Sequence, residues 1–414
     1  MNAARIATFC VIAIAVTIGV SSAQDEGPWW DWSTIDGNWG GFRQALADRG
    51  LVFFGTTLVD LQGNVSGGER RAFAPADASL VAADADLQKL AGLDGLLFHA
   101  EFVANAGEHL STKSIGNILQ VATAFAQPGY YLGQMYAQQK LFADVLTLQL
   151  GRMTTANNFA SLPVFNDYVS YAINPIPISL TNDTLYFSSL PSVEWAAAGT
   201  LASSESITTA AGVYRSNLSS GLPRVSQHGI DFSFSGSGGP MEVGQVSYNY
   251  SEGRDDTGLP GTYYFGGFYS GADYKTLSGD ETRRGNYGFY FEAQQMIYRY
   301  GGSGSDIGLT PWVGITFSPQ QSINQLRLFV LAGAVYQGLI PGRGDDNLAL
   351  GYYYGKLSNS LPSGSGEKVI ELDYTWWETP WLGIRPDLQY VFNPRGSSSS
   401  RNAAVLGAQF QLLF

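Results

Sequence analysis

The sequence has 414 residues and a formal net charge of −12 at pH 7; only 14% of the residues are charged, while 13% are aromatic and 50 are glycine. An average soluble protein carries about a quarter charged residues, so this composition is unusual for a soluble domain. The acidic balance excludes nucleic acid as a partner, because nucleic-acid binding needs a basic surface.

Residues 1–23 have the pattern of a secretory signal peptide. Arg5 provides a short basic region, residues 6–20 are apolar, and the stretch ends in the small residues that a signal peptidase requires. The apolar run is shorter than the roughly 20 residues of a membrane-spanning helix, which disfavours an N-terminal anchor. Cys10 is the only cysteine of the sequence. It leaves with the signal peptide, so we expect no disulfide and no thiolate nucleophile in the mature chain.

Residues 24–50 are expected to form an N-terminal periplasmic segment with one short helix. Residues 36–49 have an amphipathic helical pattern in which Phe42 and Leu46 share a face, and glycines stand at both ends of that pattern. The remainder, residues 51–414, is expected to form one β-domain.

From residue 51 onward, apolar and polar residues alternate with a period of two. Successive side chains of a strand point to opposite faces of a sheet. The alternation therefore places aliphatic and aromatic residues on one face, and carboxylates and amides on the other. In one clear case the apolar row is Ile370, Leu372, Tyr374 and Trp376, and the polar row is Glu371, Asp373 and Thr375.

Seventeen segments are candidate strands. An antiparallel barrel with both termini in the periplasm needs an even number of strands, so at least one candidate is wrong. We prefer sixteen strands, and the doubtful stretch is residues 192–270. The candidates are residues 51–62, 79–90, 93–106, 131–142, 144–152, 192–199, 205–214, 228–235, 241–250, 261–270, 286–299, 308–317, 326–337, 346–356, 367–376, 380–392 and 402–414.

These features predict an all-β fold, a transmembrane antiparallel β-barrel in the bacterial outer membrane. No second apolar run of about 18 residues follows the first, and a barrel wall needs apolar residues only at every second position. Aromatic pairs such as Tyr130–Tyr131 and Trp376–Trp377 fit the girdles at the membrane interfaces. The alternative, the core of a soluble β-sandwich, is less favoured.

Residues 153–191 form the longest stretch without a strand pattern, and they contain Pro163, Pro175 and Pro177. Long insertions in compact domains are usually functional. This loop is expected either to fold into the lumen as a constriction or to cap the barrel from outside, and the sequence leaves both possibilities open.

The last candidate strand is apolar at every second residue up to Phe414. A terminal aromatic residue in this position resembles the signal by which the barrel assembly machinery recognises outer-membrane proteins. We therefore expect this machinery and outer-membrane lipid as partners.

Several short motifs follow one another in a fixed order along residues 36–414. They are Gly37-Asn38-Trp39-Gly40-Gly41 with Arg43 and Leu46, Gly63-Asn64-Val65-Ser66-Gly67-Gly68, Leu150-Gly151-Arg152 with Phe159, Leu259-Pro260-Gly261-Thr262-Tyr263, Glu292-Ala293-Gln294-Gln295-Met296 with Tyr298-Arg299, Gly338-Leu339-Ile340-Pro341-Gly342-Arg343 with Asp345-Asp346, and Glu371-Leu372-Asp373-Tyr374 followed by Pro380-Trp381-Leu382, Pro386-Asp387-Leu388-Gln389-Tyr390 and Asn393-Pro394. In this order they resemble the carbohydrate-selective porin family of the OprB type.

The resemblance implies a sixteen-stranded barrel that admits small neutral sugars, glucose-like monosaccharides in particular, by passive diffusion. The stretch after Arg152 lacks cysteines that are expected in some relatives. This difference leaves the conformation of that loop open.

A pore for hexoses needs charged hydrogen-bond partners and aromatic surfaces, each weak enough to release the sugar. Trp312 is a candidate stacking surface. The alternative for every candidate is a solvated or ion-paired lumen residue that does not touch sugar. The residues expected to line the pore are Glu101, Glu292, Trp312, Glu371, Asp373, Arg385, Asp387 and Gln389.

Arg152 is a further candidate, but its position is in conflict with the alternation. It shares a row with Leu148 and Leu150, which would point it to lipid at a cost of about 2–4 kcal/mol near the midplane. Either Gly151 permits a bulge that turns Arg152 inward, or Arg152 lies beyond the membrane edge. The resemblance favours the inward role.

The expected inner rows are strongly acidic, which disfavours anions as solutes. A pore for neutral sugars is preferred, a general or cation-preferring porin is second, and a structural or adhesion barrel with a closed lumen is third. The inner acids are Asp84, Asp86, Glu101, Glu194, Asp231, Glu292, Glu371, Asp373 and Asp387, and the bases are Lys140 and Arg385.

An enzyme is not expected. The histidines His99, His109 and His228 have no metal-ligand spacing. The sequence has neither a glycine-rich phosphate loop with its lysine nor a distinct nucleophile and base. We therefore predict no catalytic residue, no metal and no cofactor.

Overall fold

The structure is a computed structural model that describes residues 27–124, 128–184, 187–215, 226–230, 232, 239–251, 258–302, 304–362 and 365–414. The expected signal peptide lies outside the described residues. In the described part of the chain, no helix is both long and apolar enough to cross a membrane.

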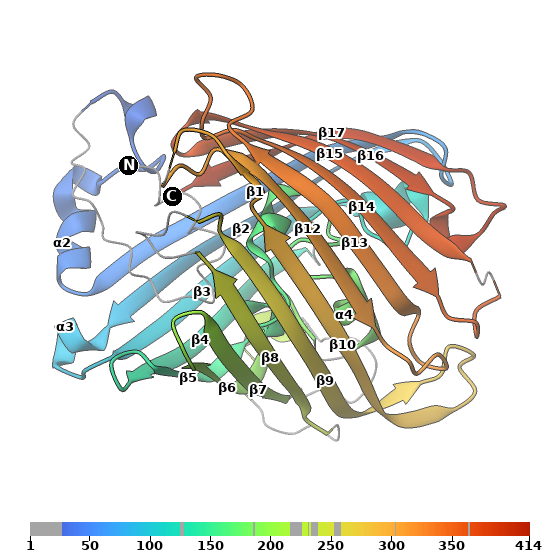
Figure 1. Cartoon of the computed structure of the whole chain (residues 1–414), viewed down its shortest axis with the longest axis horizontal. Coiled ribbons are helices and arrows are strands. Elements are labelled where there is room, and N and C mark those ends of the chain that lie inside the picture. Colours follow the sequence, from blue (N-terminus) through green and yellow to red (C-terminus); the bar gives the residue numbers. More distant parts are fainter. Residues whose placement is uncertain are drawn as a thin grey trace.

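The described strands form one antiparallel sheet that closes on itself, because β1 pairs with both β2 and β17 (Figure 1). β11 has two residues and, like β10, pairs with β12, so that sixteen of the seventeen described strands make the wall. The strands are β1 (Leu51–Ser66), β2 (Ala72–Asp86), β3 (Leu96–Gly107), β4 (Gly129–Leu141), β5 (Leu146–Met153), β6 (Glu194–Ala202), β7 (Ile207–Arg215), β8 (Met241–Tyr250), β9 (Gly261–Lys275), β10 (Thr282–Gln295), β11 (Tyr298–Arg299), β12 (Gly308–Phe317), β13 (Leu326–Gln337), β14 (Asn347–Leu357), β15 (Gly366–Thr379), β16 (Leu382–Phe392) and β17 (Ala403–Leu413).

The preferred number of sixteen wall strands is confirmed. The candidate at residues 228–235 has no strand among its described residues, and β7 pairs directly with β8. The first residues of this candidate belong to the 3-10 helix η6 (Ser226–Gly229), while residues 231 and 233–238 lie outside the described part. The expected second strand also ends too late, since residues 87–90 are helical. The Asp86 carboxylate accepts hydrogen bonds from the backbone N–H groups of Gln88 and Lys89 and so caps this helix.

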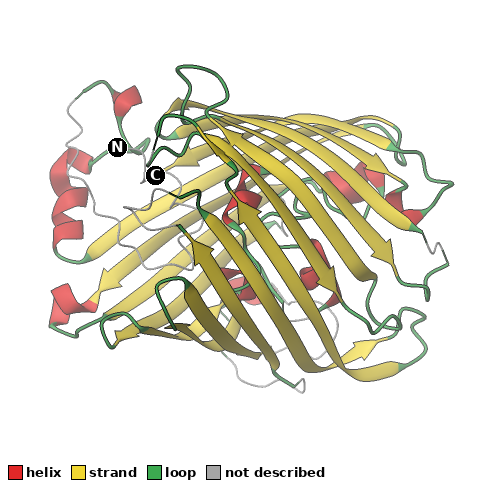
Figure 2. Cartoon of the chain, in the orientation of Figure 1, coloured by secondary structure: helices red, strands yellow, loops and turns green. Residues whose placement is uncertain are grey.

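Short helices lie at one end of the barrel and among the strands (Figure 2). The helix expected before the first strand is α2, and Gly50 follows it with φ +100°. A Cβ at Gly50 would lie 2.9 Å from the carbonyl oxygen of Asp86, so this turn needs glycine. The helical elements are η1 (Trp29–Asp31), η2 (Trp39–Gly41), α2 (Phe42–Asp48), α3 (Leu87–Ala91), η3 (Ser111–Ile115), η4 (Thr155–Asn157), η5 (Pro163–Asp167), α4 (Ile178–Asp183), η6 (Ser226–Gly229) and η7 (Pro394–Gly396).

The two rows of each strand differ sharply in exposure, as the alternation predicts. Phe102 is 64% exposed while the preceding Glu101 is 1% exposed, and Leu372 is 40% exposed between two carboxylates that are fully buried. The exposed row forms the apolar outer surface of a membrane barrel. The assignment of carboxylates and amides to the inner face is thereby confirmed for the final strands.

The interior of the barrel is packed with side chains from the connections between strands. One buried apolar cluster joins Leu119, Val121 and Phe165 of these connections to wall residues such as Phe329 and Val391. A second cluster joins Phe159 and Phe187 to the walls of neighbouring strands. The hydrophobic core of this protein therefore lies inside the barrel.

The two ends of the barrel differ in the length of their connections. At the end that carries both termini (Figure 1), residues 142–145 and 380–381 make tight turns, whereas residues 108–128 and 154–193 are long connections at the opposite end. Outer-membrane barrels have short periplasmic turns and longer extracellular loops. We therefore propose that the segment before β1 lies on the periplasmic side.

The outer row can be tested with an arginine near the middle of a strand. In Leu372→Arg the charge replaces a side chain whose register partners, Leu350 and Leu388, are also exposed apolar residues. We expect the free energy of unfolding in lipid bilayers, from urea titration, to fall by about 2–4 kcal/mol. The matched control is Leu201→Arg near the end of β6, where a cost of about 0–1 kcal/mol is expected; equal costs would contradict the lipid-facing assignment.

Candidate functional site

Two connections enter the barrel and bind to one another. Residues 108–128 join β3 to β4, and residues 154–193 join β5 to β6. The Ser170 hydroxyl donates to the carbonyl oxygen of Gln120 at 2.8 Å, the Ala172 N–H donates to the same oxygen at 3.1 Å, and the Thr123 hydroxyl donates to the carbonyl oxygen of Val169. We call these two connections the inserted segments.

Carboxylates on the inner face of the wall accept hydrogen bonds from the backbone of the inserted segments. Glu371 on β15 accepts from Val169 N at 2.8 Å and from Ser170 N at 2.7 Å. Glu367, four residues earlier on the same strand, accepts from Leu119 N at 2.6 Å. Because charge-assisted hydrogen bonds are stronger than neutral ones, these carboxylates fix both segments against the wall.

The first strand contributes a further carboxylate and an amide to this attachment. Asp60 accepts from Ala124 N at 2.9 Å, and Gln62 Nε2 donates to the carbonyl oxygen of Val121 at 3.0 Å. Gln389 Nε2 on β16 donates to the same Val121 oxygen at 2.8 Å. The segment at residues 118–124 is therefore held from three strands.

The expected pore-lining residues of β15 and β16 lie together. The register pairs Glu371 with Gln389 and Asp373 with Asp387, and all four side chains are at most 4% exposed. Arg385 lies on the same face, where its guanidinium donates to the Thr375 hydroxyl at 2.8 Å and to Gln409 Oε1 at 3.0 Å. These residues face the interior, and the inserted segments cover them.

Trp312 is on the inner face of β12, but its ring is packed rather than open. Its Nε1 donates to the Tyr168 hydroxyl at 2.8 Å, and the rings of Phe165 and Tyr168 meet it edge-on at centroid distances of 5.4 Å each. Trp312 is only 2% exposed. In this structure Trp312 packs between the wall and the inserted segment at residues 154–193.

Glu101 and Glu292 are inner-face residues at separate places on the wall. Glu101 accepts from Gln134 N at 3.0 Å and lies 3.4 Å from His99 Nε2. The other ring nitrogen of His99 lies 2.7 Å from Asp84 Oδ1, so carboxylates face both nitrogens. Glu292 is fully buried, and neither of its oxygens has a hydrogen-bond partner among the described residues.

The inward orientation favoured for Arg152 is not what the sheet shows. Arg152 pairs with Met135 and Trp195, and the ladders on both sides run through Gly151 without a register shift. Without a bulge the alternation is kept, so Arg152 stays on the outer row. It is buried because it donates to the carbonyl oxygen of Gly229 and lies 5.1 Å from the Phe232 ring centroid.

Asp60, Gln62 and Gln409 were missed as interior residues by the sequence analysis. Gln409 Nε2 donates to Asp60 Oδ1 at 2.8 Å, and Gln62 Nε2 donates to Asp387 Oδ2 at 2.7 Å. Two sequence signals indicate an inner-face position. Asp60 and Gln62 are two residues apart on one strand, and Gln409 is a polar residue between apolar neighbours. Asp231, expected on an inner row, lies outside the described residues.

The inserted segment at residues 154–193 carries two carboxylates of its own, the buried Asp183 and the half-buried Asp167. Asp183 accepts from Gln325 N at 2.7 Å and from Leu326 N at 2.8 Å; burial raises its pKa to about 7, although these hydrogen bonds oppose the rise. Burial likewise raises the pKa of Asp167 to about 6, against the attraction of Arg385. Asp183 therefore joins α4 to the start of β13.

Comparison with known proteins gives one family. The profile of the carbohydrate-selective porin, OprB family, matches residues 70–414. Porin B of Pseudomonas aeruginosa is 24% identical over 91% of this chain and 90% of its own length. A high-pH structure of Pseudomonas putida OprB has a TM-score of 0.82 at 23% identity, covering 93% of this chain and 99% of that chain; for a low-pH structure of OprB the TM-score is 0.64 at 20% identity, with the same coverage.

The contact between Tyr168 and Trp312 can be tested by removing one hydroxyl. Tyr168→Phe leaves the buried indole N–H of Trp312 without its acceptor, so the free energy of unfolding is expected to fall by about 1–3 kcal/mol. Urea titration of the protein in detergent measures this change. Tyr130→Phe, at a residue that is 76% exposed, is the control, and an equally small effect of both variants would contradict the packed position of Trp312.

Proposed function

Because this chain belongs to the carbohydrate-selective porin family, we propose that it lets small neutral sugars, monosaccharides in particular, diffuse passively across the outer membrane. The family and the fold are those of channels, and the proposed activity is passage without chemical change. The observation that carries the proposal is the attachment of both inserted segments to the inner wall, by Glu371 at Val169 and Ser170 and by Gln62 at Val121. Segments held there narrow the lumen.

In this proposal the buried acids act on sugar indirectly. Glu371, Asp373 and Asp387 are at most 4% exposed, so a sugar would meet the surface of the segments that cover them. Half-buried polar residues on the segments carry amides and hydroxyls, which exchange hydrogen bonds with sugar hydroxyls without a fixed charge; they are Gln120, Thr123, Asn158 and Asn166. Neutral groups of this kind bind weakly enough for release.

A general or cation-preferring porin is the second candidate. It is favoured by the acids of the inner face, among them Asp60, Glu292, Glu371 and Asp387, which are at most 4% exposed. The reversal potential in a salt gradient distinguishes the two: a cation pore gives a potential near the cation limit and a current that sugar does not alter. A closed structural barrel gives no current.

We also propose partners for assembly and membrane insertion. Phe414 exchanges backbone hydrogen bonds with Gly55 of β1 at 2.9 and 3.2 Å, at the seam where the barrel closes. The proposed partner is the barrel assembly machinery, which would bind this terminal strand before closure. Outer-membrane lipid would contact the exposed apolar row.

Liposome swelling tests the preference for sugar. Vesicles that contain the protein should admit glucose faster than an amino acid of similar size. The uncharged amides and hydroxyls of the inserted segments replace the hydrogen bonds that water makes to the sugar. Vesicles without protein are the control. Equal rates for the two solutes would reject carbohydrate selectivity and leave a general porin.

The role of the inserted segment can be tested at Asp183. Asp183→Ala removes the two acceptors that join α4 to Gln325 and Leu326, so the segment should loosen. We expect a larger single-channel conductance in planar bilayers and a higher glucose concentration for half-block of the current.

The matched control for this experiment is Asp144→Ala. Asp144 has a 64% exposed side chain that pairs with Lys140 in a turn, and its removal should leave both quantities unchanged. If Asp183→Ala leaves conductance and sugar block at their original values, the inserted segment does not form the constriction.

A further inference from the structure

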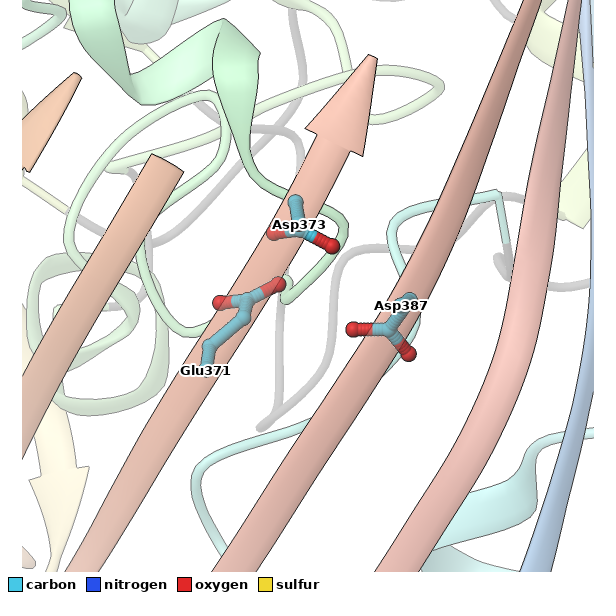
Figure 3. A group of neighbouring side chains, drawn as sticks. All are labelled: Glu371, Asp373 and Asp387. Carbon is cyan, nitrogen blue, oxygen red and sulfur yellow. The ribbon is translucent and has the colours of Figure 1, made fainter. Parts of the chain in front are cut away.

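Three carboxylates lie close together on the inner face of β15 and β16, although like charges repel one another. One oxygen from each of Glu371, Asp373 and Asp387 lies within 4.8 Å of the other two, and all three residues are buried. Figure 3 shows the Asp387 carboxylate directed across the strand gap toward Glu371 and Asp373. Like charges at this distance repel strongly in a site that excludes water.

The oxygens of Asp373 have no donor to compensate for burial. Asp373 is 0% exposed, and among the described residues no N–H or hydroxyl group donates to Oδ1 or Oδ2. These oxygens contact only acceptors there, the carboxyl groups of Glu371 and Asp387, which can donate only when protonated. Its two neighbours differ from it: Glu371 accepts from two backbone amides and Asp387 from two glutamine side chains. A buried ionised carboxylate without a partner is too costly to persist, so either a proton or a positive ion must neutralise it.

The two glutamines that donate to Asp387 also carry unpaired amide oxygens. The amide nitrogens of Gln62 and Gln389 donate to the two oxygens of Asp387 at 2.7 and 3.0 Å. Their Oε1 atoms are buried and have no hydrogen-bond partner in the described part of the chain. The neighbourhood thus combines carboxylate and amide oxygens, without a nitrogen or sulfur ligand among these five residues.

Arg385 does not complete the charge balance. It attracts Asp373 electrostatically, but its guanidinium hydrogen bonds go to Thr375 and Gln409. Asp60 adds a further buried carboxylate that the same guanidinium attracts. One arginine therefore faces at least four acids, Asp60, Glu371, Asp373 and Asp387.

We propose that Glu371, Asp373 and Asp387 bind a calcium ion, with the side-chain oxygens of Gln62 and Gln389 as additional ligands. Ca²⁺ takes about six to eight oxygen ligands from carboxylates and amide carbonyls in flexible geometry, which matches this donor set. Mg²⁺ demands a near-ideal octahedron and gives up its water reluctantly. Zn²⁺ favours His and Cys ligands. This site departs from the expectation that the chain binds no metal.

The calcium ion would hold the inserted segments in place. Glu371 binds Val169 and Ser170 of one segment, while Gln62 and Gln389 bind Val121 of the other. An ion that fixes these three side chains fixes both segments at once. The calcium site is independent of sugar transport, because Ca²⁺ binding is measured on the folded protein in the absence of sugar.

Calcium binding is tested on the full chain refolded into detergent free of lipopolysaccharide, which would itself bind divalent cations. After treatment with EDTA and desalting, the protein is titrated with CaCl₂ and with MgCl₂ at neutral pH by calorimetry, and its thermal unfolding is followed by circular dichroism. We expect saturable, single-site binding of Ca²⁺, a higher Tm with Ca²⁺ than with EDTA, and a much weaker response to Mg²⁺.

Asp373→Asn should weaken Ca²⁺ binding by about tenfold or more, since affinity follows the number of charged ligands, and should abolish the rise in Tm. Glu292→Gln is the matched control: Glu292 is equally buried and unpaired but lies on β10, so its response should equal that of the wild type. Asp387→Asn replaces Asp373→Asn if the latter does not fold.

The alternative is that protons shared between the carboxyl groups neutralise the cluster. It predicts no heat of Ca²⁺ binding and the same Tm in Ca²⁺ and EDTA. Either result with the wild type would overturn the calcium site, as would an undiminished Ca²⁺ response in Asp373→Asn. An equal response to Mg²⁺ would overturn the assignment to calcium.

Discussion

The interaction on which this structure depends is the hydrogen bond from a backbone amide of an inserted segment to a carboxylate of the wall. A segment inside a barrel carries backbone N–H groups that neither lipid nor a neighbouring strand can satisfy, and leaving them unpaired is costly. Glu371 and Asp60 supply acceptors for these groups at 2.7–2.9 Å. The carboxylates are in turn tolerable inside the wall because these donors compensate for their burial.

The strand period explains why such acceptors are available. A wall in lipid needs an apolar residue at every second position, and the intervening positions are free to be polar. Leu372 faces outward between two carboxylates that face inward. The same alternation therefore produces the membrane surface and the anchoring surface, and the apolar residues of the inserted segments, such as Phe165 and Leu119, fill the remaining interior.

The sequence predicts the strands well because the alternation is a local signal, and it places Glu371, Asp373, Asp387 and Gln389 correctly on the inner face. It does not show what covers that face. The packing of Trp312 under Tyr168 depends on contacts between residues 144 positions apart. The outward position of Arg152 depends on the register of both neighbouring strands. Residues 228 and 229, which alternate like the start of a strand, belong to the 3-10 helix η6. The fold was thus predictable from short windows, whereas the site required the tertiary contacts of two long connections.

Hydrogen exchange of backbone amides tests the attachment of the inserted segments most directly. In the folded protein in detergent, mass spectrometry of peptides that cover residues 117–124 and 167–173 should show protection close to that of the wall strands. Residues 339–342, which are exposed in the turn between β13 and β14, supply the fast reference. Protection of Val169, Ser170 and Leu119 comparable to the strands is the expected result. Exchange as fast as in the reference turn would mean that the carboxylates do not hold these segments.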